Sequence, residues 1–171
     1  IPVGGAGGVY NWDYAEIVGC TITNNRVIGA GAGGVFGRSN YPYVVSSYTN
    51  VGSSIIAGNV DNATTADVFG DNFSTRGFNL IGNVGTVTRF SHFADQTGTG
   101  ASPLDPMLDP LANDGHGTLT HRLQAGSPAI DQGYSFGAAY DQRYLSRIVQ
   151  DLTIPDASGG DGADIGAYEV Q

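Results

Sequence analysis

The chain has 171 residues, which is enough for one domain with a substantial core, and its formal net charge is −9. All seven basic residues are Arg and they form no cluster, which argues against nucleic acid and against an anionic membrane surface as partners. No stretch approaches the roughly 18 apolar residues of a transmembrane helix, so we expect no membrane insertion.

Residues 1–90 are expected to form short strands that repeat along the chain. The 27 Gly, with frequent Asn, Ser and Thr, disfavour helices and favour strands joined by tight turns. The pattern Gly-Gly-Val-aromatic at 7–10 returns at 33–36, and repeats spaced by about 20 to 50 residues are typical of stacked architectures. Because lone strands this short cannot bury a face, we expect them to stack into parallel sheets around one apolar column.

We interpret the recurring Asn and Gly residues as structural. Asn25, Asn59 and Asn83 each end a short apolar run, and stacked Asn side chains can hydrogen-bond along a column. The Gly-Gly pairs are expected at corners that need a positive φ. Cys20 is the only cysteine, which rules out an internal disulfide, and we expect it to be a buried, unreactive side chain.

Residues 91–171 are expected to form an irregular segment with few strands. Pro becomes frequent here, and the dipeptides Asp105-Pro106 and Asp109-Pro110 start turns. A stacked array presents unpaired backbone groups at its open end. We therefore expect residues 91–171 to cap the array of residues 1–90 and to form one structural unit with it.

This second half carries five motifs in sequence. They are 109–115, 118–123, 126–133, 141–143 with Arg147, and 164–169. In order and spacing they resemble the C-terminal region of bacterial choice-of-anchor surface proteins of the Q type, and the preceding repeats are similar, more loosely, to polymorphic outer-membrane proteins. The resemblance implies a right-handed parallel β-helix with an irregular C-terminal cap, in a secreted protein of the cell surface or matrix. The chain departs from the pattern at Asp114 and Tyr144, where Gly is usual, and in an inserted loop at 151–162.

Paired motif residues in the tail are expected to clamp it through ion pairs and hydrogen bonds. The bidentate geometry of Arg favours such a network over a catalytic role, because nothing nucleophilic lies beside these residues in sequence. The expected members are Asp131, Asp141, Arg143, Arg147 and Asp164.

A Gly-rich loop with three carboxylates is the candidate metal site. Asp156, Asp161 and Asp164 lie in it, and Ca²⁺ takes six to eight oxygen ligands from flexible acidic loops of this kind. The spacing is not that of an EF-hand, so a solvated acidic turn is the favoured alternative. No other cofactor is expected.

We do not expect an enzyme. Parallel β-helices host polysaccharide lyases and hydrolases, but Lys is absent and residues 1–90 contain no Asp-Asp pair for acid and base work. The alternative is a polysaccharide-binding or carbohydrate-active protein, in which exposed aromatic rings stack on sugars unless they pack in the core instead. The candidate rings are Tyr10, Trp12, Tyr14, Tyr41, Tyr43 and Tyr48.

The sequence therefore predicts a non-catalytic, extracellular structural or adhesive module. Because the first repeat begins only a few residues after Ile1, we expect the chain to be the C-terminal part of a longer array. Alternatively, the strand edges of the first repeat pair with a second copy, and the chain assembles head to tail into filaments.

Overall fold

The computed structural model describes residues 5–29, 31–38, 48–61 and 66–171, and every regular element in these ranges is a β-strand. Four sheets are parallel, and the fifth is an antiparallel pair in the second half of the chain. The fold is therefore all-β and mostly parallel, which confirms the predicted class. None of the described residues forms a helix that could cross a membrane.

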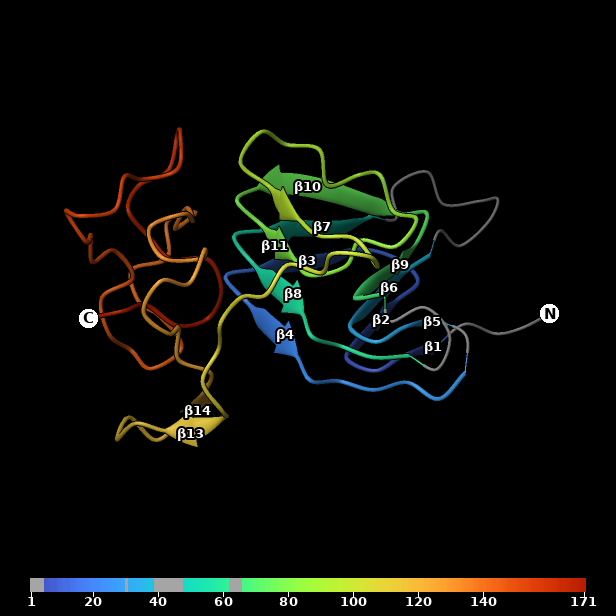
Figure 1. Cartoon of the computed structure of the whole chain (residues 1–171), viewed down its shortest axis with the longest axis horizontal. Coiled ribbons are helices and arrows are strands. Elements are labelled where there is room, and N and C mark those ends of the chain that lie inside the picture. Colours follow the sequence, from blue (N-terminus) through green and yellow to red (C-terminus); the bar gives the residue numbers. More distant parts are fainter. Residues whose placement is uncertain (1–4, 30, 39–47, 62–65) are drawn as a thin grey trace.

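The parallel strands follow one another in the same order on each pass of the chain. The first pass consists of β1 (Gly5–Ala6), β2 (Val9–Asn11), β3 (Ala15–Val18) and β4 (Thr21–Thr23). The second pass consists of β5 (Gly31–Ala32), β6 (Val35–Gly37), β7 (Thr49–Gly52) and β8 (Ile55–Ala57). The third contains β9 (Val68–Gly70), β10 (Phe73–Gly77) and β11 (Leu80–Ile81), and β12 (Gln96–Thr97) begins a fourth. Each strand pairs with its counterpart in the neighbouring pass, so the passes lie side by side (Figure 1).

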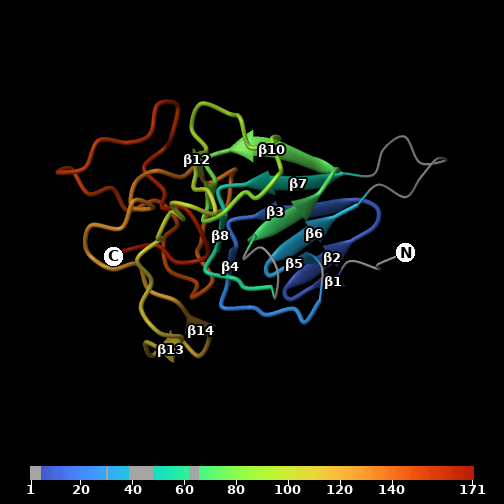
Figure 2. The same cartoon turned by 45° about the vertical axis from the view of Figure 1, so that its right-hand side comes forward.

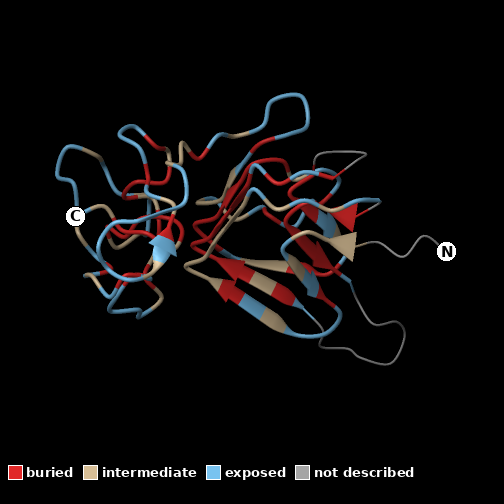
Figure 3. Ribbon diagram, turned by 90° about the horizontal axis from the view of Figure 1, so that it is seen from below, coloured by how far each residue is buried: buried red, intermediate tan, exposed pale blue. Residues whose placement is uncertain are grey.

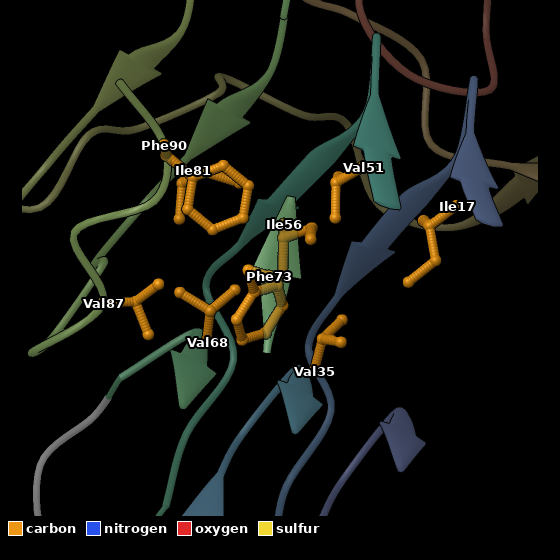
Figure 4. Packing of buried hydrophobic residues seen from close by; sticks show 9 residues of the cluster. All are labelled: Ile17, Val35, Val51, Ile56, Val68, Phe73, Ile81, Val87 and Phe90. Carbon is orange, nitrogen blue, oxygen red and sulfur yellow. The ribbon is translucent and has the colours of Figure 1, made fainter. Parts of the chain in front are cut away.

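The register brings equivalent residues of successive passes together. Cα partners are Val9, Val35 and Val68 in one sheet, and Ile22, Ile56 and Ile81 in another. Because alternate side chains of a strand point to the same face, these residues form one apolar column between the sheets. Figure 4 shows the buried part of this column, which consists of Ile17, Val35, Val51, Ile56, Val68, Phe73, Ile81, Val87 and Phe90.

In the sheet of β4, β8, β11 and β12, the two inner strands β8 and β11 are buried on both faces. Ile56 and Ile81 point into the column, whereas Ile55 and Leu80 point to the other side and pack against apolar residues of the tail. A strand covered on both faces needs consecutive apolar residues instead of alternation. The pairs Ile55-Ile56 and Leu80-Ile81 meet this requirement.

The Gly-Gly pairs allow close approach of neighbouring passes. None of Gly7, Gly8, Gly33 and Gly34 has a positive φ, so the prediction that they serve left-handed corners is wrong. A Cβ atom on Gly33 would lie 2.3 Å from the backbone N of Val60, and one on Gly7 would lie 2.3 Å from the carbonyl O of Gly33. The backbones of successive passes therefore fit together only without a side chain at these positions.

A polar column accompanies the apolar one. The backbone N and Nδ2 of Asn25 donate to Oδ1 of Asn59, at 3.0 and 2.9 Å, which confirms hydrogen bonding along the stacked Asn for this pair. Asn59 donates in the same way to Oδ1 of Asp67, at 2.7 and 2.9 Å. Oδ2 of Asp67 accepts from the backbone N of Asn83, at 2.7 Å. Asp67, which lies outside the repeat pattern, thus links the second Asn to the third.

The tail lies along the side of the stack. In both Figure 1 and Figure 2, the orange and red segments of the tail lie beside the stacked strands, not over the first or last pass. The backbone N of Ala167 donates to Oγ1 of Thr21 in the first pass, and the backbone N of Gly166 donates to the carbonyl O of Ser53 in the second. Besides β12, the regular structure that the described part of the tail forms is the antiparallel pair of β13 (Ala112–Asn113) and β14 (Leu119–Thr120).

Residues 84–90 contribute apolar side chains to the end of the apolar column. Val87 and Phe90 belong to the column, and the ring centroid of Phe90 lies 5.5 Å from that of Phe73. Part of residues 91–171 also lies at this end, because β12 pairs with β11 as the last strand of its sheet. The division into strands at 1–90 and a capping segment at 91–171 stays a prediction. The outward apolar face of Ile55 and Leu80 packs against apolar residues of the tail, and Figure 3 shows buried residues at this boundary.

Candidate functional site

The tail holds a buried network of carboxylates and guanidinium groups. Nε and Nη2 of Arg143 donate to Oδ2 of Asp141, at 2.9 and 2.6 Å, and both side chains are buried. Nη1 of Arg143 donates to Oδ2 of Asp114, at 2.7 Å, and this bond lowers the pKa of Asp114. The guanidinium also lies 3.5 Å from the ring centroid of Tyr168. One Arg thus joins two carboxylates and an aromatic ring from three separate tail motifs.

Asp164 connects the remaining predicted members. Its Oδ1 accepts from the backbone N of Asp131 at 2.8 Å, and its Oδ2 accepts from the backbone N of Val170 at 2.7 Å. Nη2 of Arg147 donates to the carbonyl O of Asp164, at 2.9 Å. Burial, together with the negative charge of Asp131, raises the pKa of Asp164 to about 6. The structure therefore brings Asp164, Asp131 and Arg147 together through backbone groups, without a carboxylate–guanidinium contact among them.

Glu169 is a further member that sequence reasoning missed. Its side chain is fully buried, with Oε1 accepting from the backbone N of Val149 at 3.0 Å and Oε2 from the backbone N of Asp164 at 2.9 Å. Burial and the nearby charge of Asp164 raise its pKa to about 8. Its backbone N donates to Oδ2 of Asp141, which links the two halves of the network. The sequence held one sign that Glu169 is special: Glu is rare in this chain, and Glu16 is the only other one.

The buried carboxylate of Asp131 is only partly hydrogen-bonded. Its Oδ2 accepts from the backbone N of Asp151 at 3.0 Å, but its Oδ1 is buried and has no hydrogen-bond partner. Burial raises the pKa of this carboxyl group, and the backbone of Asp131 has a φ of 55°. An unsatisfied buried acceptor costs on the order of 1–3 kcal/mol, so Asp131 is a destabilising part of an otherwise well-bonded network.

The network mainly supplies hydrogen-bond acceptors to backbone N–H groups. A segment with almost no regular secondary structure must satisfy these donors by other means. Carboxyl groups with raised pKa values also serve as acid–base catalysts in enzymes. A catalytic role would require that a substrate can reach these carboxyl groups. Cavities of about 430, 390 and 360 Å³ border the tail. Of the four buried carboxylates of the network, only Asp141 lines one of these, and Arg143 neutralises it.

The three carboxylates predicted to bind calcium have separate protein partners. Asp156 accepts from Nε2 of Gln150 at 2.9 Å, and Asp161 accepts from Oγ of Ser135 at 2.6 Å. Asp164 is engaged in the network described above. In the part of the chain that the structure describes, no three His, Cys, Asp or Glu side chains are grouped so that they could hold a metal ion. The calcium site remains a prediction from sequence.

The predicted sugar-stacking residues lie partly in an aromatic row on β2, β6 and β9. The rings of Tyr10 and Phe36 stack at a centroid distance of 4.9 Å and an angle of 7°, and Phe69 follows Phe36 at 5.6 Å. Trp12 lies 5.9 Å from Tyr10 and carries Arg38 over its ring at 5.8 Å. Phe36 is buried in the row, whereas Tyr10 and Trp12 are 39% and 44% exposed.

The other aromatic candidates lie elsewhere. Tyr14 is exposed, and its hydroxyl donates to Oε1 of Glu16 at 2.8 Å. Tyr48 is also exposed, while Tyr41 and Tyr43 lie outside the described residues. Cys20 packs against the apolar column, and burial raises the pKa of its thiol, which is opposite to the shift that makes a cysteine reactive.

Comparison with known proteins adds no relative to this picture. No protein-family model, curated protein or solved structure gives a significant match to the chain. The resemblance to choice-of-anchor surface proteins therefore stays a prediction from the tail motifs.

Proposed function

We propose that the chain folds as a short right-handed parallel β-helix and serves as a non-catalytic structural or adhesive module outside the cell or on its surface. The observation that carries this proposal is the register of the passes, in which β2, β6 and β9, and likewise β4, β8 and β11, align equivalent residues. Strands stacked in this way form a stiff rod that is stabilised by backbone hydrogen bonds between the passes and by the packed columns of side chains.

The chemistry of the tail supports a structural role. Its buried carboxylates accept hydrogen bonds from backbone N–H groups, and Asp141 is neutralised by Arg143. A catalytic acid or base has to reach a substrate proton directly or through one water. The carboxylates of this network hold segments of the strand-poor tail to one another, which is a structural role.

A second candidate is polysaccharide binding, and one observation favours it. Tyr10 and Trp12 are both partly exposed on the same surface, and Arg38 lies beside them. Aromatic rings with an apolar body and a polar edge are suited to partly wet binding surfaces. Under this alternative the module is adhesive through a neutral glycan, because the net charge of −9 repels polyuronides.

One set of measurements distinguishes these functions. The purified chain is screened on a glycan array and incubated with neutral polysaccharides and polyuronides, together with the variant Trp12→Ala and the control Tyr144→Ala, which alters an exposed Tyr of the tail. The structural proposal predicts no glycan binding and no new reducing ends or unsaturated products. Glycan binding that Trp12→Ala abolishes and Tyr144→Ala retains would establish the polysaccharide-binding alternative, and turnover of any polysaccharide would overturn the non-catalytic assignment.

A further inference from the structure

A cavity of about 430 Å³ lies where the last strand of the stack meets the tail. Residues 93–96, which lead into β12, form one wall, and the other walls come from tail segments within 127–132 and 154–158. Figure 2 shows β12 beside the orange and red segments of the tail. Clefts of about 300–1,000 Å³ commonly hold small ligands. The residues that line this cavity are not members of the carboxylate network.

Phe93 forms an exposed aromatic wall of the cavity. The residue is 73% exposed, yet its ring lies against the ring of His92 at a centroid distance of 4.3 Å. His92 in turn lies 5.7 Å from Phe78, which stacks on Tyr134 at 5.5 Å. The ring of Phe93 therefore stands on a packed aromatic base while it remains open to solvent.

Elsewhere in the chain, exposed and buried aromatic rings carry a guanidinium group. The pairs in the described residues, with the distance from Cζ to the ring centroid, are Arg143 with Tyr168 at 3.5 Å, Arg76 with Phe136 at 4.3 Å and Arg38 with Trp12 at 5.8 Å. A cation within about 6 Å of a ring centroid is attracted by the negative face of the ring. No described Arg lies over Phe93, so this ring can accept a cation from another molecule.

Two amide oxygens in the lining are free to accept hydrogen bonds. Nε2 of Gln96 donates to the carbonyl O of Pro128 at 2.8 Å. Nε2 of Gln132 donates to the carbonyl O of Pro155 at 2.8 Å and to that of Asp131 at 3.1 Å. Within the described residues, no donor is bonded to Oε1 of either Gln. Because the backbone holds both amide nitrogens, the two oxygens are fixed acceptors that suit a ligand rich in N–H donors.

The charge around the cavity is negative. Asp95 lines it, and each oxygen of this carboxylate accepts two hydrogen bonds from uncharged donors. Within the described residues, Asp95 forms no ion pair with a basic side chain, and neither do Asp151 and Asp156 of the adjoining loop. No Arg is among the described residues that line the cavity, and the chain contains no Lys. The cavity therefore attracts a cation and repels an anion.

From these observations we infer that the cavity binds the guanidinium group of an Arg side chain on a partner polypeptide. The planar guanidinium stacks on the ring of Phe93 and donates to the free amide oxygens of Gln96 and Gln132, while Asp95 offsets its charge. A Lys ammonium lacks both the plane and the fork of donors, so it is the weaker ligand. The inference rests on the adhesive form of the proposed function, for which it names the chemistry of the partner.

A neutral sugar suits this cavity less well. Sugar hydroxyls donate and accept, so they need donors as well as acceptors around them. Gln132 supplies none, because its Nε2 already donates to two backbone carbonyls. A sugar also gains nothing from the uncompensated charge of Asp95, whereas a guanidinium does.

A blocked amino acid, N-acetyl-arginine methylamide, tests the inference. It is titrated into the full chain and followed by backbone NMR shifts. We expect one molecule to bind per chain with a dissociation constant of about 1 mM, and shifts concentrated at residues 93–96, 127–132 and 154–158. The citrulline analogue has the same shape without the charge, and it should bind roughly tenfold more weakly because it loses the charge-assisted hydrogen bonds.

The variant Phe93→Leu removes the ring and keeps an apolar side chain. Phe93 is mostly exposed, so the variant should fold like the parent chain, and its affinity for the arginine probe should fall about fivefold. The matched control is Phe69→Leu, because Phe69 is a partly exposed ring on β9 that does not line the cavity. This control should bind the probe as tightly as the parent chain.

The absence of shifts at about 50 mM of the arginine probe would overturn the inference. Equal affinity for the citrulline analogue, or an affinity that Phe93→Leu leaves unchanged, would do so as well. Tighter binding of methyl glucoside than of the arginine probe would assign the cavity to a sugar instead. The spectrum of the free chain separates these failures from failure of the proposed β-helix, because contacts between Ile22, Ile56 and Ile81 report the stack without any ligand.

Discussion

Arg143 donates two hydrogen bonds to a single oxygen of Asp141, from Nε at 2.9 Å and from Nη2 at 2.6 Å, in a site where both side chains are buried. The same guanidinium donates to the backbone O of Glu169, so the pair connects two tail motifs. Removing one member of a buried pair leaves an uncompensated charge, which costs about 3–5 kcal/mol.

We therefore expect Arg143→Met to lower the free energy of unfolding by about 3 kcal/mol or more in urea titrations. The matched control is Arg76→Met, because Arg76 pairs with Glu16 at 3.7 Å on the surface and its loss should cost under about 1 kcal/mol. Equal effects of the two substitutions would show that the Arg143 pair does not clamp the tail.

The stability of the chain should fall as the pH rises from 5 to 9. Burial raises the folded-state pKa of Asp164 to about 6 and of Glu169 to about 8, above their ordinary values near 4. A raised pKa contributes stability that is fully present below the unfolded-state pKa and is lost as the pH rises through the folded-state pKa. The expected loss is on the order of a few kcal/mol, measured as the urea midpoint against pH.

Glu169→Gln isolates the upper part of this decline. The amide cannot ionise and still offers an acceptor oxygen, so the fall around pH 8 should disappear while the fall around pH 6 remains. An unchanged profile in this variant, or a parent chain that becomes more stable between pH 5 and 9, would rule out Glu169 as the buried titrating group.

Asp131→Asn should stabilise the chain. The buried Oδ1 of Asp131 has no partner and burial raises the pKa of this group, so the charged form is unfavourable at pH 8. Asn tolerates the φ of 55° and keeps an acceptor for the backbone N of Asp151. We expect a gain of about 1 kcal/mol at pH 8 that shrinks in acid. Asp161→Asn is the contrasting variant: its carboxylate is bonded to Ser135, and it should lose stability.

Tyr144 adopts a left-handed backbone, with a φ of 64°, at the position where the resembled surface proteins carry Gly. Its side chain is 82% exposed and contributes little packing. A left-handed residue other than Gly costs about 1–2 kcal/mol. Tyr144→Gly should therefore melt at a higher temperature than Tyr144→Ala, which keeps the backbone cost. If the Ala variant is the more stable of the two, the left-handed conformation at this position is not present in solution.

The strand stack could be predicted from sequence because its signal is local and repeated. The Val and Ile of each pass recur at equivalent positions, and only a parallel register aligns them. The role of Gly33 could not be assigned in the same way. Both a positive φ and a close approach of backbones select Gly, and only the 2.3 Å distance to the backbone of Val60 separates these causes.

The position of the tail and the composition of its network were harder to predict. Ile55 and Leu80 look like ordinary core residues in sequence, yet they face the tail and require it to lie along the side of the sheet. Asp161 and Asp164 are neighbours in sequence, but Ser135 and Val170 bond them separately. Ser135 lies 26 residues from Asp161 in the chain, so spacing within the loop could not distinguish a metal site from a hydrogen-bond network.

The central claim is that the passes stack in parallel with Ile22, Ile56 and Ile81 in one row. Neighbouring strands lie about 4.8 Å apart, so methyl groups of adjacent passes are close in space and those two passes apart are not. Methyl-labelled Ile in the full chain allows these contacts to be measured by nuclear Overhauser spectroscopy. The account predicts cross-peaks from Ile56 to both Ile22 and Ile81, with the Ile22–Ile81 peak weak or undetected. A spectrum in which Ile56 contacts neither residue, or in which Ile22 contacts Ile81 directly, would contradict the stack.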